Sequence, residues 1–412
     1  MSEVKLPEGY KQTEVGVIPE DWEVKELSQI VELKSGETIT SKNISSDDFF
    51  PCYGGNGLRG YTSTFNRNGE HVLIGRQGAL CGNIEYVNNK FFASEHALVV
   101  TTIKNYSYKW LAYVLDRMHL NQYSESSAQP GLSAIKLKKL KVSLPPKQEQ
   151  TAIATALSDV DNLIQSLEKL IAKKEAIKTG TMQQLLTGKT RLPEFATRED
   201  GSPKGFKQTE LGRIPEDWKV GTLSELSSYI NDGTHYTPSY VQNGVPFYSV
   251  ENVTANDFIN VKNISLEEHN RLIKRCKPER GDILMTRIGS LGKTRIIDWD
   301  VDASIYVSLA LIKPSNTIKS QYMYEFSKSN LFQKEVEKRS LVNATPQKIN
   351  MAEIGQVQIC YPKNKNEQTA IATTLSDMDT EIQALQQRLE KTKDIKQGMM
   401  QQLLTGKVRL AY

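Results

Sequence analysis

Three glycine–lysine segments are the residues of this chain whose types could bind a nucleotide phosphate. Residues 182–189 and 400–407 both read MQQLLTGK, and a third segment, RIGSLGKT, begins at Arg287. A phosphate-binding loop needs Gly, four further residues and then Gly-Lys-Ser/Thr, because successive backbone N–H groups wrap the phosphates. The leading glycine of such a loop is replaced by Gln183 in the first segment and by Arg287 in the third. In the second segment, Val408 occupies the position that requires the hydroxyl of Ser or Thr. The sequence therefore predicts no nucleotide loop, and the repetition needs another explanation.

Cysteine and histidine, which often carry chemistry, are few and scattered. The four cysteines lack CxxC spacing and the five histidines form no HExxH motif. This pattern favours a reduced cytoplasmic location over a disulfide framework or a zinc site. The sequence has no run of 18 apolar residues and its start, MSEVKLPEGYKQ, lacks the apolar stretch of a signal peptide. We expect a cytoplasmic protein without a metal, a cofactor or a membrane partner.

Basic residues are clustered although the net charge is only +4. Eight Lys and Arg residues lie within 271–295, and residues 136–141 read KLKKLK. Local basic patches are compatible with nucleic acid, but they also occur on ordinary solvated faces. The KLKKLK segment fits either a DNA clamp or a solvated edge strand. Charge alone leaves both interpretations open.

The elements that would position these residues are written twice. YKQTEVGVIPEDWEV at 10–24 returns as FKQTELGRIPEDWKV at 206–220, and EQTAIATALSDV at 149–160 returns as EQTAIATTLSDM at 367–378. MQQLLTGK follows the second block at the same distance in both copies. Internal repeats of this kind indicate one structural unit used twice.

Two variable segments, 31–145 and 227–362, lie between the repeated blocks and barely resemble each other. Both contain short β-rich runs broken by glycine and polar residues, such as HVLIG and ALVVTTI in the first and DILMTRI and YVSLALI in the second. Short helices are expected around 107–120 and 320–337. We predict two similar α+β domains, each around a mixed, twisted sheet, that share a fold and differ in surface.

The repeated blocks that begin with EQ carry a heptad stripe of apolar residues, typical of helices that pack as a coiled coil. The predicted helix-pair core is Ile153, Leu157, Val160, Ile164, Leu167 and Ile171 with Ile371, Leu375, Met378, Ile382, Leu385 and Leu389. In the first copy a second line widens the apolar face: Ala156, Leu163, Leu170 and Ile177. A helix of roughly 35 residues spans about 50 Å, longer than the cover of one small domain requires. We therefore expect an antiparallel pair within the chain, with an intermolecular zipper as the alternative.

These patterns divide the chain into four predicted segments. The first variable domain occupies residues 1–146 and the first constant helix 147–190. A linker and the second variable domain follow at 191–363, and the second constant helix at 364–412. The helices would act as a spacer between two domains related by approximate two-fold symmetry. Gly188 and Gly406 are expected to cap the helix C-termini.

The layout resembles the specificity subunit of type I restriction-modification systems. The motifs that carry the resemblance are IPEDW twice, PPKQEQTAIATALSDVD and NEQTAIATTLSDMD at the starts of long helices, QQLLTGK twice, and DGTHYTP. It covers nearly the whole chain, and the duplicated EQ block followed by QQLLTGK is its specific part. The resemblance implies that each variable domain is a target-recognition domain reading one half of a split site in double-stranded DNA.

The resemblance also implies partners. The constant helices would set the spacing between the half-sites and dock two methyltransferase subunits, which methylate adenine with S-adenosylmethionine. Restriction subunits would join them to form an endonuclease that uses ATP and Mg²⁺. The chain itself would have no catalytic activity and no cofactor. The residues agree, because LPPK at 144–147 lacks the polar and aromatic neighbours of an adenine-methylation motif. A coiled-coil scaffold whose variable domains bind proteins instead of DNA is the alternative function.

Sequence-specific DNA reading needs hydrogen-bonding side chains on loops or strand ends, with Lys and Arg contacting phosphates. In the first domain the candidates are Asn56, Arg59, Tyr61, Arg76, Gln77, His96 and Gln129. In the second domain they are Thr234, His235, Tyr236, Arg287 and Ser290, with Lys293 and Lys348 as phosphate contacts.

Several of these candidates have an equally strong structural interpretation. Arg76 and Arg287 match each other in domains expected to read different sequences, so binding phosphate or bracing the fold competes with base reading. His235 is as compatible with a packed turn. Gly36 and Gly233 are expected to serve tight turns.

The IPEDW repeats support a different prediction. Trp22 and Trp218 follow Pro19 and Pro215 at identical spacing. We expect each tryptophan to dock the start of its domain onto a constant helix, with direct contact to a modification subunit as the alternative.

Overall fold

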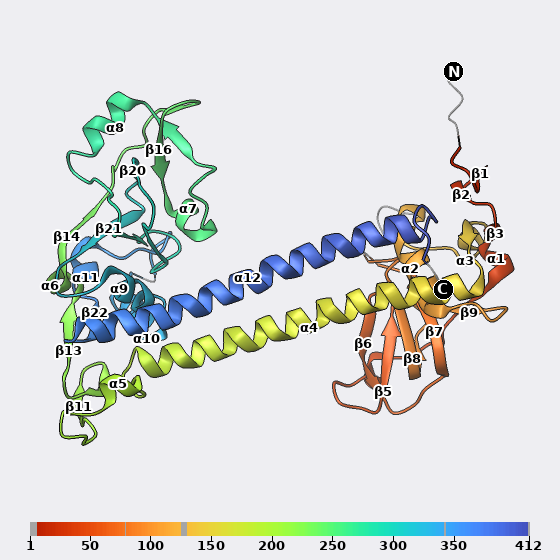
Figure 1. Ribbon diagram of the computed structural model, residues 1–412, viewed down its shortest axis with the longest axis horizontal. Helices are drawn as coiled ribbons and strands as arrows, with labels where there is room; N and C mark the ends of the chain where they lie inside the picture. Colours follow the sequence, from red (N-terminus) through yellow and green to blue (C-terminus); the bar gives the residue numbers. More distant parts are fainter. Residues whose placement is uncertain (1–5, 79, 125–129, 342, 411–412) are drawn as a thin grey trace. The chain divides into compact units, whose positions relative to one another are not determined.

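A computed structural model describes residues 6–78, 80–124, 130–341 and 343–410. It divides into two compact units, the first made of Met1–Lys169 with Gln386–Tyr412 and the second of Leu170–Leu385. The division crosses both long helices (Figure 1), so each unit contains one variable domain and parts of both helices rather than consecutive segments of the chain. Within the described residues no helix has the length and apolar character needed to cross a membrane.

The first unit is built on a six-stranded sheet in the order β4-β9-β7-β8-β5-β6. All neighbours are antiparallel except β5 and β8, where Cys52 pairs with Phe92 in parallel. Alternate residues of the sheet face opposite sides: Val72 and Ile74 join the core that includes Trp110, and Leu73 lies in a second cluster on the other face. The strands are β4 (Val31–Ser35), β5 (Phe50–Gly54), β6 (Gly57–Thr62), β7 (Arg67–Gly75), β8 (Ile84–Ala93) and β9 (Ala97–Thr102).

Short elements join this sheet to the constant helices. Hairpin β1–β2 comes first, and β3 then pairs with β10. These elements are β1 (Tyr10–Thr13), β2 (Gly16–Pro19), β3 (Glu23–Glu26), α1 (Leu27–Ile30), η1 (Ser41–Asn43), α2 (Tyr108–Arg117), η2 (Leu120–Tyr123), α3 (Ala134–Lys138) and β10 (Lys141–Leu144). The KLKKLK segment is therefore not an edge strand: it ends a short helix whose Leu137 is fully buried, and only its last residue begins β10.

The second unit repeats the same plan with one break. Its sheet β14-β21-β18-β19 corresponds to β4-β9-β7-β8, and a second sheet has the order β15-β17-β16-β20. In the second unit, two short strands, β19 and β20, take the place of the long strand β8. Strand β20 pairs in parallel with β16, in the same way that the end of β8 pairs in parallel with β5. Both variable domains are thus mixed α+β structures around the predicted kind of sheet.

In the second unit, strands β18 and β21 overlap the β-rich runs expected from the sequence. The single helix expected around 320–337 is divided into two helices, α9 and α10. Its elements are α5 (Pro193–Ala196), β11 (Phe206–Thr209), β12 (Gly212–Pro215), β13 (Trp218–Thr222), α6 (Leu223–Leu226), β14 (Ser227–Asp232), β15 (Tyr240–Val241), β16 (Val245–Tyr248), α7 (Val250–Ala255), β17 (Lys262–Ile264), α8 (Leu266–Leu272), β18 (Ile283–Thr286), β19 (Thr294–Ile296), β20 (Ser304–Ile305), β21 (Leu309–Pro314), α9 (Ser320–Ser327), α10 (Asn330–Arg339), α11 (Met351–Gly355) and β22 (Gln358–Pro362).

The constant helices are α4 (Lys147–Leu185) and α12 (Lys365–Leu403). Their segments run antiparallel in each unit. Lys396 bonds Asp161 at 2.7 Å in the first unit, and Lys174 bonds Glu381 at 2.7 Å in the second. The predicted antiparallel pairing within one chain is therefore present in both units.

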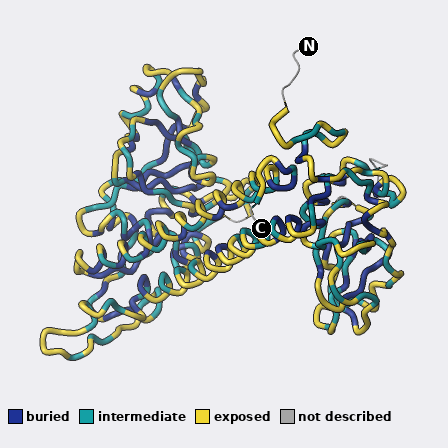
Figure 2. The backbone as a smooth tube through the Cα atoms, turned by 45° about the vertical axis from the view of Figure 1, so that its right-hand side comes forward, coloured by how far each residue is buried: buried dark blue, intermediate teal, exposed yellow. Residues whose placement is uncertain are grey.

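None of the twelve residues predicted to form the helix-pair core is exposed. The start of each stripe, however, packs in the core of a variable domain, Ile153 in the first unit and Ile371 in the second. Figure 2 shows buried residues concentrated in the interior of each variable domain, whereas much of the long helices is exposed. The second apolar line is a different case, since Leu163, Leu170 and Ile177 are 39%, 39% and 45% exposed. That line does not widen the packed face.

Candidate nucleic-acid interface

Each variable domain is fixed to the constant helices by an ion cluster, which consists of one arginine and two carboxylates together with a tryptophan indole. In the first unit Arg409 bonds both carboxylate oxygens of Asp21 at 2.9 Å and both of Glu149 at 2.5 and 2.8 Å. The indole of Trp22 donates to Glu149 at 2.9 Å. Glu149 is fully buried at the start of α4, so its charge requires this pairing. Trp22 thereby docks the start of its domain onto a constant helix, as predicted.

The second unit contains the same cluster from the other copy of each motif. Arg191 bonds Asp217 at 2.8 and 3.1 Å and Glu367 at 2.8 and 2.6 Å, and the indole of Trp218 lies 3.4 Å from Glu367. The arginine follows MQQLLTGK in both cases. The end of α4 therefore completes the base of the second variable domain, and the end of the chain completes that of the first.

The glycine of MQQLLTGK makes this closure possible. Gly188 and Gly406 have φ of +68° and +71°, a left-handed conformation that ends the helix. A Cβ on Gly188 would lie 2.4 Å from Pro215, and one on Gly406 would lie 2.4 Å from Pro19. The repeated motif is thus a helix C-cap that packs directly on IPEDW.

Arg76 and Arg287 lie at equivalent points where β7 and β18 end. Arg76 donates to Ser35 at 3.0 Å and is half-buried. Arg287 is only 8% exposed; it bonds Asp232 at 3.0 Å and donates to the carbonyls of Val307 and Ile349. Burial lowers the pKa of Arg287 from its ordinary value, against the effect of Asp232. The guanidinium of Arg287 donates its hydrogen bonds to groups within the protein, so Arg287 braces the fold. We therefore no longer assign it to base reading.

The glycines expected in tight turns have another role. Gly36 and Gly233 follow the ends of β4 and β14, and neither has a positive φ. A Cβ would lie 2.1 Å from the carbonyl oxygen of Ala93 in the first case and 1.9 Å from that of Ile305 in the second. Both positions require glycine because another strand passes too closely for any side chain.

Four of the first domain's candidates meet at one edge of its sheet. Asn56 is exposed in the turn between β5 and β6, and Arg76 begins the loop after β7. A Cβ on Gly55 would lie 2.4 Å from the carbonyl oxygen of Gln77, which places the two loops in contact. The Gln77 side chain lies 2.7 Å from the imidazole of His96. This edge therefore presents an amide pair, an imidazole and a guanidinium, the groups that read base edges.

The remaining candidates of the first domain are more dispersed. Arg59 is exposed on β6, where its side chain lies over Gly54, and Tyr61 is half-buried further along the strand. Gln129 lies outside the described residues.

The second domain places His235 and Tyr236 at the corresponding edge, after β14. Both are exposed, and His235 lies 3.0 Å from the buried carboxylate of Asp232. Thr234 is only 7% exposed and its hydroxyl bonds the backbone of Tyr236, so it shapes the loop rather than facing solvent. The candidate contact surface here consists of His235 and Tyr236.

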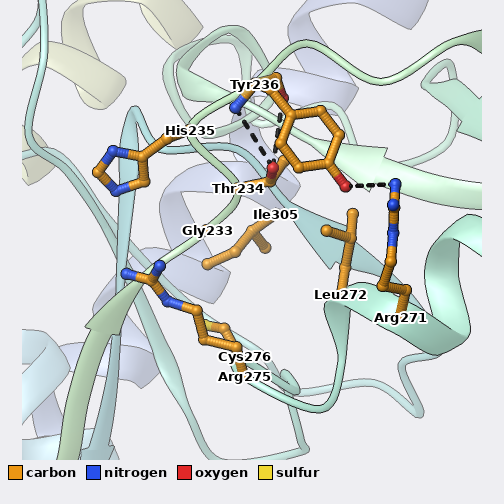
Figure 3. A pocket seen from close by; sticks show the side chains of 9 residues that line it. All are labelled: Gly233, Thr234, His235, Tyr236, Arg271, Leu272, Arg275, Cys276 and Ile305. Carbon is orange, nitrogen blue, oxygen red and sulfur yellow. Dashed lines mark hydrogen bonds between the residues drawn. The ribbon is translucent and has the colours of Figure 1, made fainter.

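A cavity of about 310 Å³ lies beside this loop, and it brings in two arginines that were not among the predicted site residues. Figure 3 shows the Tyr236 hydroxyl facing Arg271, which donates to it at 2.8 Å and lies 5.3 Å from the ring centre. Arg275 bonds Asp232 at 2.7 Å. The basic run 271–295 indicated these residues, but not that they meet the DGTHYTP loop.

Cys276 also lines this cavity. Burial raises the pKa of its thiol to about 12, so the sulfur stays protonated and is a poor nucleophile. The cavity therefore offers cationic and aromatic contact and no thiolate chemistry. Among the described residues no group of three or more His, Cys, Asp or Glu side chains is placed to hold a metal ion.

The other candidates of the second domain gather at a neighbouring loop. Ser290 is exposed, and the backbone of Gly289 donates to Gln347 at 2.8 Å, beside the exposed Lys348. Ile288 and Lys348 form an isolated β-bridge. Lys293 is exposed just before β19. The structure thus brings Ser290 and Lys348 together.

Comparisons with known proteins agree with this architecture. The family model described as the type I restriction modification DNA specificity domain matches residues 19–178 and 215–393. The type I restriction enzyme EcoprrI specificity subunit of Escherichia coli is 40% identical over 156 residues, which are 37% of this chain and 39% of that protein. The MjaVIII specificity subunit of Methanocaldococcus jannaschii is 26% identical over 424 residues, covering 98% of this chain and 96% of that one.

Solved structures show the same fold. The S subunit of a type I restriction-modification system from M. genitalium has a TM-score of 0.65 at 17% identity, covering 97% of this chain and 98% of that chain. A chain from a study of assembly and conformational transition of the type I system has a TM-score of 0.52 at 16% identity, covering 95% and 99%. With two matched regions and two units of one plan, this chain belongs to the family of type I restriction-modification DNA specificity subunits.

Proposed function

We propose that this chain selects the DNA sequence on which a type I restriction-modification complex acts, each variable domain reading one half of a bipartite double-stranded site. The observation that carries the proposal is a contrast between two parts of each unit. The ion cluster at the base is the same in both units, whereas the exposed edge holds Asn56, Gln77 and His96 in one and His235 and Tyr236 in the other. A shared frame with different hydrogen-bonding side chains suits two readers of different half-sites.

The repeated surfaces suit two identical protein partners. MQQLLTGK and the EQ block occur once in each unit on equivalent parts of α4 and α12. We propose that they dock two methyltransferase subunits, through which restriction subunits join. Adenine methylation with S-adenosylmethionine and ATP- and Mg²⁺-dependent cleavage would then belong to those partners, with this chain non-catalytic. The constant helices would set the number of unread base pairs between the half-sites.

Methylation mapping tests the bipartite reading. Co-expressing the chain with its methyltransferase subunit and mapping N6-methyladenine across host DNA should return one split motif with an unread spacer. A single contiguous motif, or methylation that is independent of this chain, would contradict the proposal. A scaffold that binds only proteins would leave the methylation pattern unchanged when the chain is deleted.

Single substitutions then assign the half-sites. Gln77→Ala should relax one half of the motif and His235→Ala the other, because each lost base contact removes roughly 1–3 kcal/mol of discrimination. Lys348→Ala serves as a comparison: loss of a phosphate contact should weaken binding to all sequences and relax neither half. Relaxation of the same half by both Gln77→Ala and His235→Ala would contradict the assignment.

A further inference from the structure

We propose that a basic groove in the first unit, between the end of α2 and the last turns of α12, binds the phosphate backbone of the DNA whose bases the first variable domain reads. The groove has a volume of about 570 Å³. Its charged and titratable lining residues are Arg117, His119, Lys393, Lys396, Lys407 and the single acid Asp116. The inference rests on the proposed DNA recognition and adds a second contact surface to it.

Two of the groove's four Lys and Arg side chains form no ion pair among the described residues. Lys396 bonds Asp161 at 2.7 Å, and Lys393 bonds the exposed Glu390 at 3.0 Å. For Arg117 and Lys407 no carboxylate partner lies among the described residues. An uncompensated cationic groove attracts a polyanion, and duplex DNA presents a regular row of phosphates to which Lys and Arg donate.

The groove is continuous with the candidate base-reading edge. His119 has φ of +46°, unusual for a residue other than glycine, and turns the chain directly from α2 into η2. η2 packs on the loop after β7: a Cβ on Gly82 would lie 2.5 Å from the backbone nitrogen of Asn121. That loop begins with Arg76 and Gln77. If a duplex is bound at this edge, Arg117 and His119 of the groove therefore lie close to its phosphate backbone.

The charge of the groove is only partly repeated in the second unit. Lys393 corresponds in the repeat to Glu175, a reversal of charge, although Lys396 and Lys407 correspond to Lys178 and Lys189. The Lys178–Asp379 pair of the second unit repeats the Lys396–Asp161 pair of the first. The docking motif is identical in both units, whereas the positive charge at Lys393 is present in the first unit only, and this difference favours DNA over the methyltransferase partner at that position.

Phosphate contacts are independent of sequence, so the test needs no knowledge of the target site. The probe is a mixed-sequence duplex of about 40 base pairs, whose phosphates follow one another about every 3.4 Å along each strand. It is titrated at several salt concentrations against the complex of this chain with its methyltransferase subunit. The variant is Arg117→Gln/Lys393→Glu/Lys407→Gln. Lys393→Glu introduces the residue type already found at Glu175 in the same helix position, so the helix tolerates it. The control is Lys173→Gln, which removes one exposed lysine of α4 that lies outside both repeated docking motifs and does not line the groove.

The expected result is weaker binding by the triple variant, with the slope of log K against log salt reduced by roughly 2.7, since each of the three lost contacts removes about 0.9. Lys173→Gln should keep the wild-type slope. A wild-type slope in the triple variant overturns the groove proposal while leaving DNA recognition standing. A wild-type complex without salt-dependent binding overturns the proposed function itself. Loss of methyltransferase assembly with an unchanged slope identifies a protein interface and also overturns the proposal.

A second measurement does not depend on the variant folding. Lysine labelling of the wild-type complex, read by mass spectrometry with and without the duplex, should show protection by DNA at Lys393 and Lys407 and none at Lys173. Equal labelling of Lys407 in the presence and absence of DNA rejects the groove.

Discussion

At the scale of single residues, one buried carboxylate organises the recognition edge of the second unit. Asp232 is 2% exposed and bonds Arg275 at 2.7 Å, Arg287 at 3.0 Å and His235 at 3.0 Å. At the equivalent site in the first unit, Arg76 donates to the hydroxyl of Ser35. The same arginine position is therefore part of a buried ion network in one unit and a half-exposed hydrogen bond in the other.

This difference predicts unequal costs for the same substitution. Arg287→Met should destabilise the second unit by about 3 kcal/mol or more, because it leaves the buried Asp232 short of its partner. Arg76→Met should cost about 1 kcal/mol, the value of one hydrogen bond. Hydrogen exchange in β18 and β7 measures each unit separately. Equal losses in the two strands would show that Arg287 does not brace the second unit.

The sequence predicted those site residues whose placement depends on near neighbours in the chain, and not those whose contacts come from distant segments. Exposed loop residues such as Asn56 and His235 follow local turn chemistry, and the structure does place them at sheet edges. The bracing role of Arg287 depends on the order β14-β21-β18, which brings Asp232 beside it, and no local pattern encodes that order. The contact between Arg271 and Tyr236 likewise arises from tertiary packing.

At the scale of elements, the helices were the most predictable part of the molecule. Their heptad stripe is long enough to define a periodicity, and both helices begin and end at matching residues of the repeat. Short elements were less predictable: KLKKLK was too brief to show whether it forms a strand or a helix end. Burial of Leu137 in the first unit's core decides the outcome.

The helix ends allow a prediction with an internal control. Gly188→Ala and Gly406→Ala should each destabilise their unit by more than 1 kcal/mol, because φ is positive and the new Cβ meets proline at 2.4 Å. Gly180→Ala and Gly398→Ala lie inside the same helices with nothing within 4 Å of the new Cβ. These should stabilise the helices by roughly 0.5–1 kcal/mol. Thermal melting of the four variants distinguishes the two pairs, and stabilisation by Gly406→Ala would contradict the cap.

At the scale of the whole molecule, each copy of MQQLLTGK completes the unit that contains the EQ block of the other copy. The first MQQLLTGK is followed by Arg191, which serves the second unit, and the last one by Arg409, which serves the first. The first unit therefore combines the beginning and the end of the chain. The hydroxyl of Tyr10 illustrates this closure, donating to the carbonyl of Gly406 at 2.8 Å.

This connection predicts a distant effect of truncation. Removing residues 399–412 takes Leu403, Leu404 and Arg409 out of the first unit, leaving part of its core exposed and the buried Glu149 without its cation. Amide exchange should accelerate in β4, β7 and β9, near the beginning of the chain, while β14, β18 and β21 keep their protection. The point variant Arg191→Ala should give the opposite pattern, because Glu367 belongs to the second unit. Acceleration confined to α12 in the truncated chain would mean that its end does not support the first unit.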